Sequence, residues 1–271
     1  MLYLVGLGLG DVTDITVKGL EVVRKADHVY LEAYTSILCS TNGDHSSLER
    51  FYGRQVKVAD RETVETSADR ILDEAVNGDV ALLVVGDPFG ATTHTDFVLR
   101  AVQRNIPYNV IHNTSILNAV GCCGLQLYTF GETVSIPFWT ETWKPDSFFD
   151  KIINNLKNNF HTLCLLDIKV KEKSIEALMK GKEVYEEPRF MTVDIAAKQL
   201  LQVIENRVAE QSILTAHNLV VGLARIGSDS QKIKCCSLQD MSCTDIGKPL
   251  HCLVIPGKLH PLEEEMLAIF K

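Results

Sequence analysis

The chain has 271 residues, of which 46% are hydrophobic and 23% charged, and its formal net charge is −8 at pH 7. This composition is typical of a folded protein with enough apolar residues for two domains, and the negative balance argues against a broad nucleic-acid-binding surface. The apolar runs are too short to cross a bilayer and the first residues lack the order of a signal peptide, so we expect a soluble, cytoplasmic protein with no membrane contact.

The first 112 residues alternate strand and helix patterns. Apolar runs bounded by turn residues predict strands at 2–5, 28–32, 56–59, 80–85 and 108–112, and helical periodicity predicts helices at 16–25, 64–76 and 96–104. We expect polar loops at 35–45 and, later in the chain, at 169–173. Regular alternation of this kind favours a mostly parallel sheet, so residues 1–112 are predicted to form an N-terminal α/β domain.

The first strand enters the loop Gly6-Leu-Gly-Leu-Gly-Asp11. A dinucleotide fingerprint needs its third glycine where Asp11 stands, so the match fails by one position. The acidic residues that follow, up to Asp14, oppose the binding of a pyrophosphate. We interpret the segment as a glycine-rich loop that lets the backbone approach a ligand.

The fourth predicted strand, Val80 to Val85, is an unbroken apolar run that favours burial on both faces. Gly86, Asp87, Pro88 and Gly90 follow it, at the edge of an α/β sheet where small ligands bind. Two interpretations stay open: a tight turn capped by Asp87, and a ligand-binding edge with a charged side chain.

The second half begins where Asn113 breaks the alternation, and residues 113–271 are predicted to form a C-terminal α/β domain. Ser115 can cap a helix of small residues that runs to Cys123. Further strands are predicted at 133–138, 161–168, 219–226, 232–236 and 249–255, and helices at 146–157, from 192 onward and at 261–270. The pattern predicts a mixed sheet with helices.

Eight cysteines fit a reducing compartment. The vicinal pairs Cys122–Cys123 and Cys235–Cys236 have a spacing that seldom forms disulfides, and no Cys-x-x-Cys motif offers a zinc site. We interpret the cysteines as small buried residues and expect no metal.

Several segments together resemble the diphthine synthases, over essentially the whole chain and in order. They are Leu4-Val-Gly-Leu-Gly-Leu-Gly-Asp11, Gly86-Asp-Pro-Phe-Gly-Ala-Thr-Thr-His94, His112-Asn-Thr-Ser-Ile-Leu-Asn-Ala-Val-Gly121, Leu163-Cys-Leu-Leu-Asp-Ile-Lys-Val170, Val221-Gly-Leu-Ala-Arg-Ile-Gly227 and Pro249-Leu-His251. The first two alone indicate only the wider tetrapyrrole-methylase-like superfamily. Glu32-Ala-Tyr-Thr-Ser36 and Phe138-Trp-Thr-Glu-Thr-Trp143 resemble the eukaryotic branch, the diphthine methyl ester synthases.

This resemblance implies a tetrapyrrole-methylase-like fold of two α/β domains, with a mostly parallel first sheet and a mixed second sheet. It implies a homodimer that binds S-adenosylmethionine in the cleft between the domains and releases S-adenosylhomocysteine. The implied substrate is a modified histidine of translation elongation factor 2, methylated three times on an amine and once on a carboxylate in diphthamide biosynthesis. The elongation factor is thus the expected protein partner.

The family's cofactor contacts fall on positions where this sequence keeps the motif. They are Leu9, Asp87, Gly90, Ser115, Ile116, Leu166, Ile226 and His251. Asp87 can oppose the positive charge of the cofactor, and the leucines and isoleucines can wall its nucleoside. Because the donor is already activated, the protein mainly has to align the reactants and exclude water, and the sequence names no catalytic residue.

Simpler interpretations of these residues stay open. A histidine on an apolar strand is commonly a hydrogen-bonded core residue, and Leu166 and Ile226 would be core in any α/β protein. Asp11, Asp167 and Arg225 lie near predicted strand ends and can serve either a substrate or the fold.

Three alternative functions remain. One is a related methyltransferase that acts on a tetrapyrrole or on ribosomal RNA, although the acidic composition weakens the RNA version. A nicotinamide-dependent oxidoreductase is disfavoured by the broken fingerprint. The last is a non-catalytic protein that binds the elongation factor.

Overall fold

The computed structural model describes residues 1–34, 36–38, 46–60, 63–64, 68–170, 185–207 and 213–271. Contacts divide the chain into two compact units. The first unit contains residues 1–117, 169–188 and 227–229, and the second contains 118–168, 189–226 and 230–271. Within the described ranges, no helix combines the length and apolar character that a membrane span requires. The predicted loops at 35–45 and 169–173 lie largely outside these ranges.

The first unit is built on a five-stranded sheet in the order β3-β2-β4-β1-β5. Its strands are β1 (Leu2–Gly6), β2 (His28–Glu32), β3 (Lys57–Ala59), β4 (Val80–Val84) and β5 (Tyr108–Ile111). All of these strands pair in parallel. Every residue of β4 is buried, as the apolar run predicted, because helices cover both faces of the sheet.

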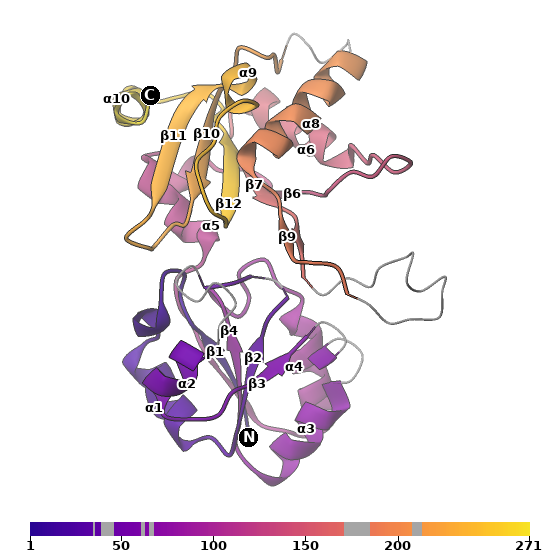
Figure 1. Cartoon of the computed structure of the whole chain (residues 1–271), viewed down its shortest axis with the longest axis vertical. Coiled ribbons are helices and arrows are strands. Elements are labelled where there is room, and N and C mark those ends of the chain that lie inside the picture. Colours follow the sequence, from indigo (N-terminus) through magenta and orange to yellow (C-terminus); the bar gives the residue numbers. More distant parts are fainter. Residues whose placement is uncertain (35, 39–45, 61–62, 65–67, 171–184, 208–212) are drawn as a thin grey trace. The chain divides into compact units, whose positions relative to one another are not determined.

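Alternate side chains of the strands point to opposite faces, which gives this unit two apolar clusters. Leu82 belongs to the cluster with α3 (Ala68–Asn77) and α4 (His94–Gln103), and Leu83 to the one with α1 (Val17–Lys25) and α2 (Ser46–Tyr52). Figure 1 shows these two helical layers on either side of the sheet. The sequence did not predict α2. The helix predicted at 64–76 agrees with α3 from Ala68 onward, and residues 65–67 lie outside the described ranges.

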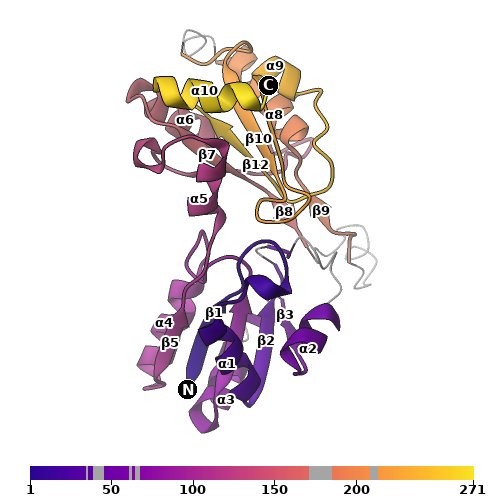
Figure 2. The ribbon, with the colours of Figure 1, turned by 90° about the vertical axis from the view of Figure 1, so that its left-hand side faces the viewer.

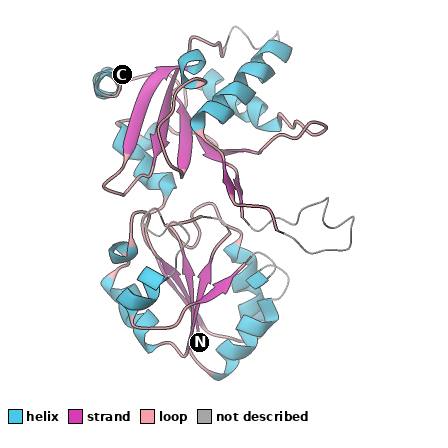
Figure 3. Ribbon diagram, in the orientation of Figure 1, coloured by secondary structure: helices cyan, strands magenta, loops and turns pink. Residues whose placement is uncertain are grey.

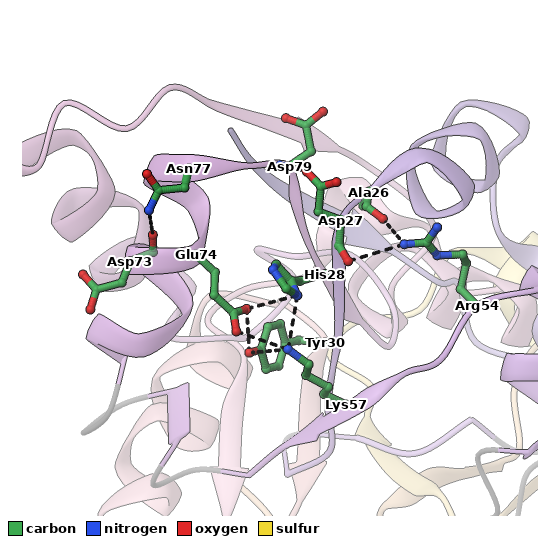
Figure 4. A network of polar contacts seen from close by, with 10 residues as sticks. All are labelled: Ala26, Asp27, His28, Tyr30, Arg54, Lys57, Asp73, Glu74, Asn77 and Asp79. Atoms are coloured by element: carbon green, nitrogen blue, oxygen red, sulfur yellow. Dashed lines mark hydrogen bonds and ion pairs between the residues drawn. The ribbon is translucent and has the colours of Figure 1, made fainter.

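A polar network lies at the amino ends of β2 and β3 (Figure 4). The Tyr30 hydroxyl donates to Glu74 at 2.8 Å, and Lys57 Nζ donates to Glu74 and to His28 Nδ1, both at 3.2 Å. A lysine ammonium can only donate, so the Nδ1 atom of His28 accepts. The network holds α3 against the amino ends of the strands, whereas the loops described below lie at the carboxyl ends.

The second unit has a mixed five-stranded sheet in the order β11-β10-β12-β7-β6. Its strands are β6 (Val134–Ile136), β7 (Thr162–Leu166), β10 (Leu219–Ala224), β11 (Lys232–Ser237) and β12 (His251–Ile255). Among these strands β6 and β7 pair in parallel, and the other neighbours pair antiparallel. The two predicted sheet types, mostly parallel and mixed, are thereby confirmed (Figure 3).

Two helices cover one face of this sheet, α6 (Ser147–Lys157) and α8 (Val193–Asn206). The C-terminal helix α10 (Pro261–Ile269) lies on the other side (Figure 2). The described residues also form shorter elements: the 3₁₀ turns η1 (Val12–Asp14), η3 (Val120–Cys123) and η4 (Leu127–Thr129), the helices α5 (Ile116–Ala119) and α9 (Leu238–Met241), and the strands β8 (Ile168–Lys169) and β9 (Arg189–Phe190).

A fully buried histidine ties α10 to the core of the second unit. The amide of Gly257 donates to His161 Nδ1 at 2.9 Å, so the proton of the neutral ring lies on Nε2, which donates to Glu263 at 3.2 Å. The Glu263 carboxylate also accepts from the amides of Gln126 and His260, both at 2.8 Å. Burial would raise the pKa of Glu263, but these hydrogen bonds outweigh it and lower the pKa.

Replacing this carboxylate should destabilise the second unit. Glu263→Gln leaves one acceptor oxygen for three converging donors, which should cost about 1–3 kcal/mol and lower the melting temperature by several degrees at pH 7. Because the pKa of Glu263 is lowered, the deficit should be complete above pH ~4.3 and shrink as the pH falls through the lowered pKa of the folded state.

Glu265→Gln is the matched control, since Glu265 is exposed on the same helix. Thermal melting followed by circular dichroism measures both variants. Equal melting temperatures for the two would contradict the assigned role of Glu263.

Candidate functional site

The loops that follow β1 and β4 are joined by two backbone hydrogen bonds at the carboxyl edge of the first sheet. The amide of Gly8 donates to the Gly86 carbonyl at 3.2 Å, and the amide of Gly86 donates to the Gly8 carbonyl at 2.7 Å. Gly8 has φ +76° and Gly86 φ +82°, in the left-handed region that favours glycine. The sequence motifs thus fold into one platform of two interlocked glycine loops.

Asn113 locks a third segment onto this platform. Its Nδ2 atom donates to the carbonyls of Gly6 at 3.0 Å and Asp14 at 2.9 Å. A Cβ atom at Gly6 would lie 2.7 Å from the Gly86 carbonyl oxygen and 2.8 Å from Asn113 Cβ. Glycine at position 6 is therefore required for the close approach of the three segments.

The acidic residues of the first glycine loop are turned toward its own backbone. Asp11 accepts from the amide of Thr13, and Asp14 accepts from the amide of Gly10, both at 2.7 Å. These two amides are consequently occupied, in contrast to the free N–H groups of a phosphate-binding loop. Asp11 serves the fold here.

Asp87 is both a turn cap and a fixed negative charge. Its Oδ1 accepts from the amide of Phe89 at 2.9 Å, and its Oδ2 accepts from the amide of Asn113 at 3.0 Å and from His112 Nδ1 at 2.8 Å. Burial alone would raise the pKa of Asp87, but the three hydrogen bonds outweigh burial and lower it. The carboxylate is therefore ionised at neutral pH, and its loss should lower stability as well as any ligand affinity.

Other predicted cofactor residues gather beside Asp87. A Cβ atom at Gly86 would lie 3.7 Å from Ser115 Cβ and 3.8 Å from Leu9 Cδ2. At Gly90 a Cβ atom would lie 2.6 Å from Ser115 Cβ, so glycine is needed for this approach. Ile116 follows directly as the first residue of α5.

The remaining three predicted residues lie at one end of the second sheet. Leu166 is the last residue of β7, and His251 is the first residue of the antiparallel neighbour β12. The pairing of Cys252 with Leu165, continued by one residue, places His251 opposite Leu166. Ile226 comes two residues after β10, whose last residue pairs with His251. Their combination with the five residues of the first unit into one site stays a prediction.

Both ring nitrogens of His251 are engaged by the backbone. Nε2 donates to the carbonyls of Gly247 at 3.0 Å and Lys248 at 2.9 Å, while Nδ1 accepts from the Val193 amide at 3.3 Å. Burial lowers the pKa of His251, which keeps the ring neutral at pH 7. A ligand can therefore meet this residue through its ring carbons or its backbone.

Arg225 and Asp167, the polar residues predicted near strand ends, hold the backbone of the second unit. Arg225 has φ +52° and donates to the carbonyls of Ile246 at 3.2 Å, of Lys248, and of Ser230 at 3.0 Å. Asp167 accepts from the Phe138 amide at 2.9 Å. The contacts of Arg225 fix the turn that leads to Ile226.

Sequence reasoning did not assign roles to His112 and Asn113, although both stand in a quoted motif. The available signal was their position immediately after β5, where the strand's carboxyl end meets the loops of β1 and β4. With Asp87 they place a fixed carboxylate at the carboxyl ends of the strands, and the apolar side chain of Leu9 lies near Gly86. That combination suits a small ligand that is cationic at one end and apolar at the other.

Comparison with known proteins agrees with the family resemblance found in the sequence motifs. Residues 1–212 match the family model of the tetrapyrrole (corrin/porphyrin) methylases. The chain is 62% identical to the diphthine methyl ester synthase of Homo sapiens, covering 100% of this chain and 95% of that protein. It is 49% identical to that of Dictyostelium discoideum, covering 100% and 98%. A crystal structure of a diphthine synthase superposes with a TM-score of 0.83 at 35% identity, covering 99% of this chain and 95% of the other.

A pair of glycine variants separates backbone strain from crowding in the platform. Gly8 and Gly53 both have positive φ angles, +76° and +70°, but a Cβ atom at Gly8 would lie 2.7 Å from Asp14 Cβ, whereas one at Gly53 meets nothing within 4 Å. Gly53→Ala should cost about 1 kcal/mol through strain alone. Gly8→Ala should cost more because the loop must move, and the binding of the methyl donor that the family implies should weaken about tenfold.

Calorimetric titration and thermal melting of both variants measure these two effects. Equal melting temperatures and equal affinities for the two variants would contradict the role given to the Gly8 loop.

Proposed function

This chain belongs to the tetrapyrrole methylases and, within them, to the diphthine methyl ester synthases, and from that membership we propose that it methylates the modified histidine of elongation factor 2. The observation that carries the proposal is the 62% identity over the whole chain to a relative of that name. The compared region spans the whole chain, so it includes the glycine loops, Asp87 and the segment after β5 as well as the rest of the fold. The reaction is proposed as three methyl transfers to an amine and one to a carboxylate, a step of diphthamide biosynthesis.

S-adenosylmethionine is the proposed cofactor, and the described residues fit it. The cofactor supplies a methyl group on a positively charged sulfonium. The ionised Asp87 can oppose positive charge, and Leu9, which lies beside Gly86, offers an apolar side chain to the nucleoside. In the first unit Leu9, Asp87, Gly90, Ser115 and Ile116 are proposed to hold it, and in the second Leu166, Ile226 and His251.

The protein's contribution is then orientation and exclusion of water. Binding the methyl donor and the nucleophile side by side makes their reaction effectively unimolecular, and this alignment is a large part of such catalysis. The hydrogen bonds of Asn113 and Asp87 preorganise the loops, so little ordering remains when the ligand binds. Contacts with the folded elongation factor should also help to place the side chain, and a short peptide should therefore react poorly.

The proposal includes a homodimer that acts in the cytoplasm, which follows from the family resemblance. Light scattering of the purified chain measures its mass in solution.

Two rival functions have direct tests. An oxidoreductase would bind NAD rather than S-adenosylmethionine in a calorimetric titration, and a non-catalytic binding protein would hold the factor without turnover.

The proposed reaction makes a specific prediction about substrates and products. The purified chain should label elongation factor 2 from cells blocked at this step, but not the factor from cells that lack the preceding modification, because the amine and carboxylate exist only after it. Mass spectrometry should count four added methyl groups, and a mild alkali wash should remove one of them as an ester.

Three alkali-stable methyl groups would instead indicate a simpler trimethylating enzyme. Equal labelling of both factor preparations, or labelling of RNA, would exclude the proposed function.

A further inference from the structure

His112 stands at the carboxyl edge of the first sheet with its ring held from one side. It follows the last residue of β5, and its side chain is 68% exposed. The ring nitrogen Nδ1 lies 2.8 Å from Asp87 Oδ2, and the ring of Phe89 lies beside it with centroids 6.2 Å apart. This exposed histidine therefore has a defined orientation next to an expected cofactor contact.

The partner of His112 fixes where its proton lies. An ionised carboxylate only accepts hydrogen bonds, so Nδ1 of His112 must carry the proton that Asp87 accepts. The neutral ring then presents Nε2 as an unprotonated lone pair. A carboxylate that sets the tautomer of a histidine in this way also stabilises the ring after it gains a proton.

No other histidine whose ring contacts the structure describes combines this tautomer with exposure. His94 Nδ1 lies 2.9 Å from the Pro88 carbonyl and so carries the proton, but His94 is 1% exposed and its Nε2 is buried without a hydrogen-bond partner. The others accept at Nδ1 and therefore carry the proton on Nε2: His28, His161, His251 and His260.

We propose that Nε2 of His112 takes the proton from the amine nucleophile in each of the three N-methylation steps. This inference rests on the proposed function. The substrate ammonium gives its proton to Nε2, and the freed nitrogen lone pair forms the bond to the methyl carbon. The bond between that carbon and sulfur breaks, its electron pair stays on sulfur as a neutral thioether, and the proton passes from His112 to water.

The role of His112 is specific to one class of step. An amine protonated at neutral pH has no free lone pair, so each N-methylation releases a proton. A carboxylate is already anionic and forms its ester with no proton to remove. Comparing the rates of methylation at the amine and at the carboxylate therefore distinguishes two roles. Loss of a proton acceptor slows only the amine reaction, whereas loss of a residue that binds the cofactor or maintains the fold slows both.

The test uses His112→Asn, because asparagine can place an N–H group near the position of Nδ1 and keep the bond to Asp87 while removing Nε2. Two substrates are prepared: elongation factor 2 blocked before this step, and fully methylated factor from which mild alkali has removed the ester. The ratio of the N-methylation rate to the ester-forming rate should fall about 10²-fold in the variant, the lower end for loss of a general base.

His28→Asn is the matched control. His28 is also partly exposed, at 37%, but it is the first residue of β2, whereas His112 follows the last residue of the parallel strand β5. This variant should keep the wild-type ratio. A proportional fall of both rates in His112→Asn, or no change in either, would overturn the inference. If wild-type protein labels neither substrate, the proposed function fails, and the inference with it.

A second readout is independent of turnover. Nitrogen-15 NMR of the imidazole rings in the free protein should show neutral His112 with its proton on Nδ1 and neutral His28 with its proton on Nε2. Asp87→Asn should weaken this preference in His112, and calorimetry should show that His112→Asn binds S-adenosylmethionine within about threefold of wild type. A proton on Nε2 of neutral His112 in the wild-type protein would overturn the assignment.

Discussion

Two backbone hydrogen bonds between Gly8 and Gly86 hold the loops after β1 and β4 against each other at the carboxyl edge of the first sheet. The parallel register of these neighbouring strands, which pairs Gly6 with Val84, delivers both loops to the same level. The bridge then brings the Gly6 carbonyl under the side-chain amide of Asn113. Separating the loops would leave buried backbone groups without partners, at about 1–3 kcal/mol each, so the two hydrogen bonds favour the joined arrangement.

Asp87 is the charged residue that lies next to these loops. Two amide donors and one imidazole donor converge on its carboxylate, and together they keep it ionised despite its burial. The second unit uses the reverse arrangement, in which backbone amides donate to Nδ1 of His161 and His251 and fix the proton on Nε2. Whether the group that faces Nδ1 accepts or donates a hydrogen bond thus decides which ring nitrogen of each histidine carries the proton.

Sequence predicted the strands well where burial determines the pattern. The apolar run from Val80 became β4, and Thr192 precedes α8 as expected. The helix α2 was missed because its sequence carries only two buried side chains, Leu48 and Tyr52, and no helical stripe of useful length. At the site, the motif near Asp87 was found, but local sequence cannot show that Asn113 reaches back over a hundred positions to Gly6.

The exposure of His112 matters as much as its tautomer for a reaction that repeats. Three successive N-methylations release three protons, so a proton acceptor must return to its neutral form between transfers. A ring that is 68% exposed can pass its proton to water directly. His94 has the same tautomer, but its side chain is buried and its Nε2 has no contact with solvent. Among the histidines whose ring contacts the structure describes, His94 and His112 have the lone pair on Nε2, and solvent access distinguishes His112 as the one that can exchange protons repeatedly.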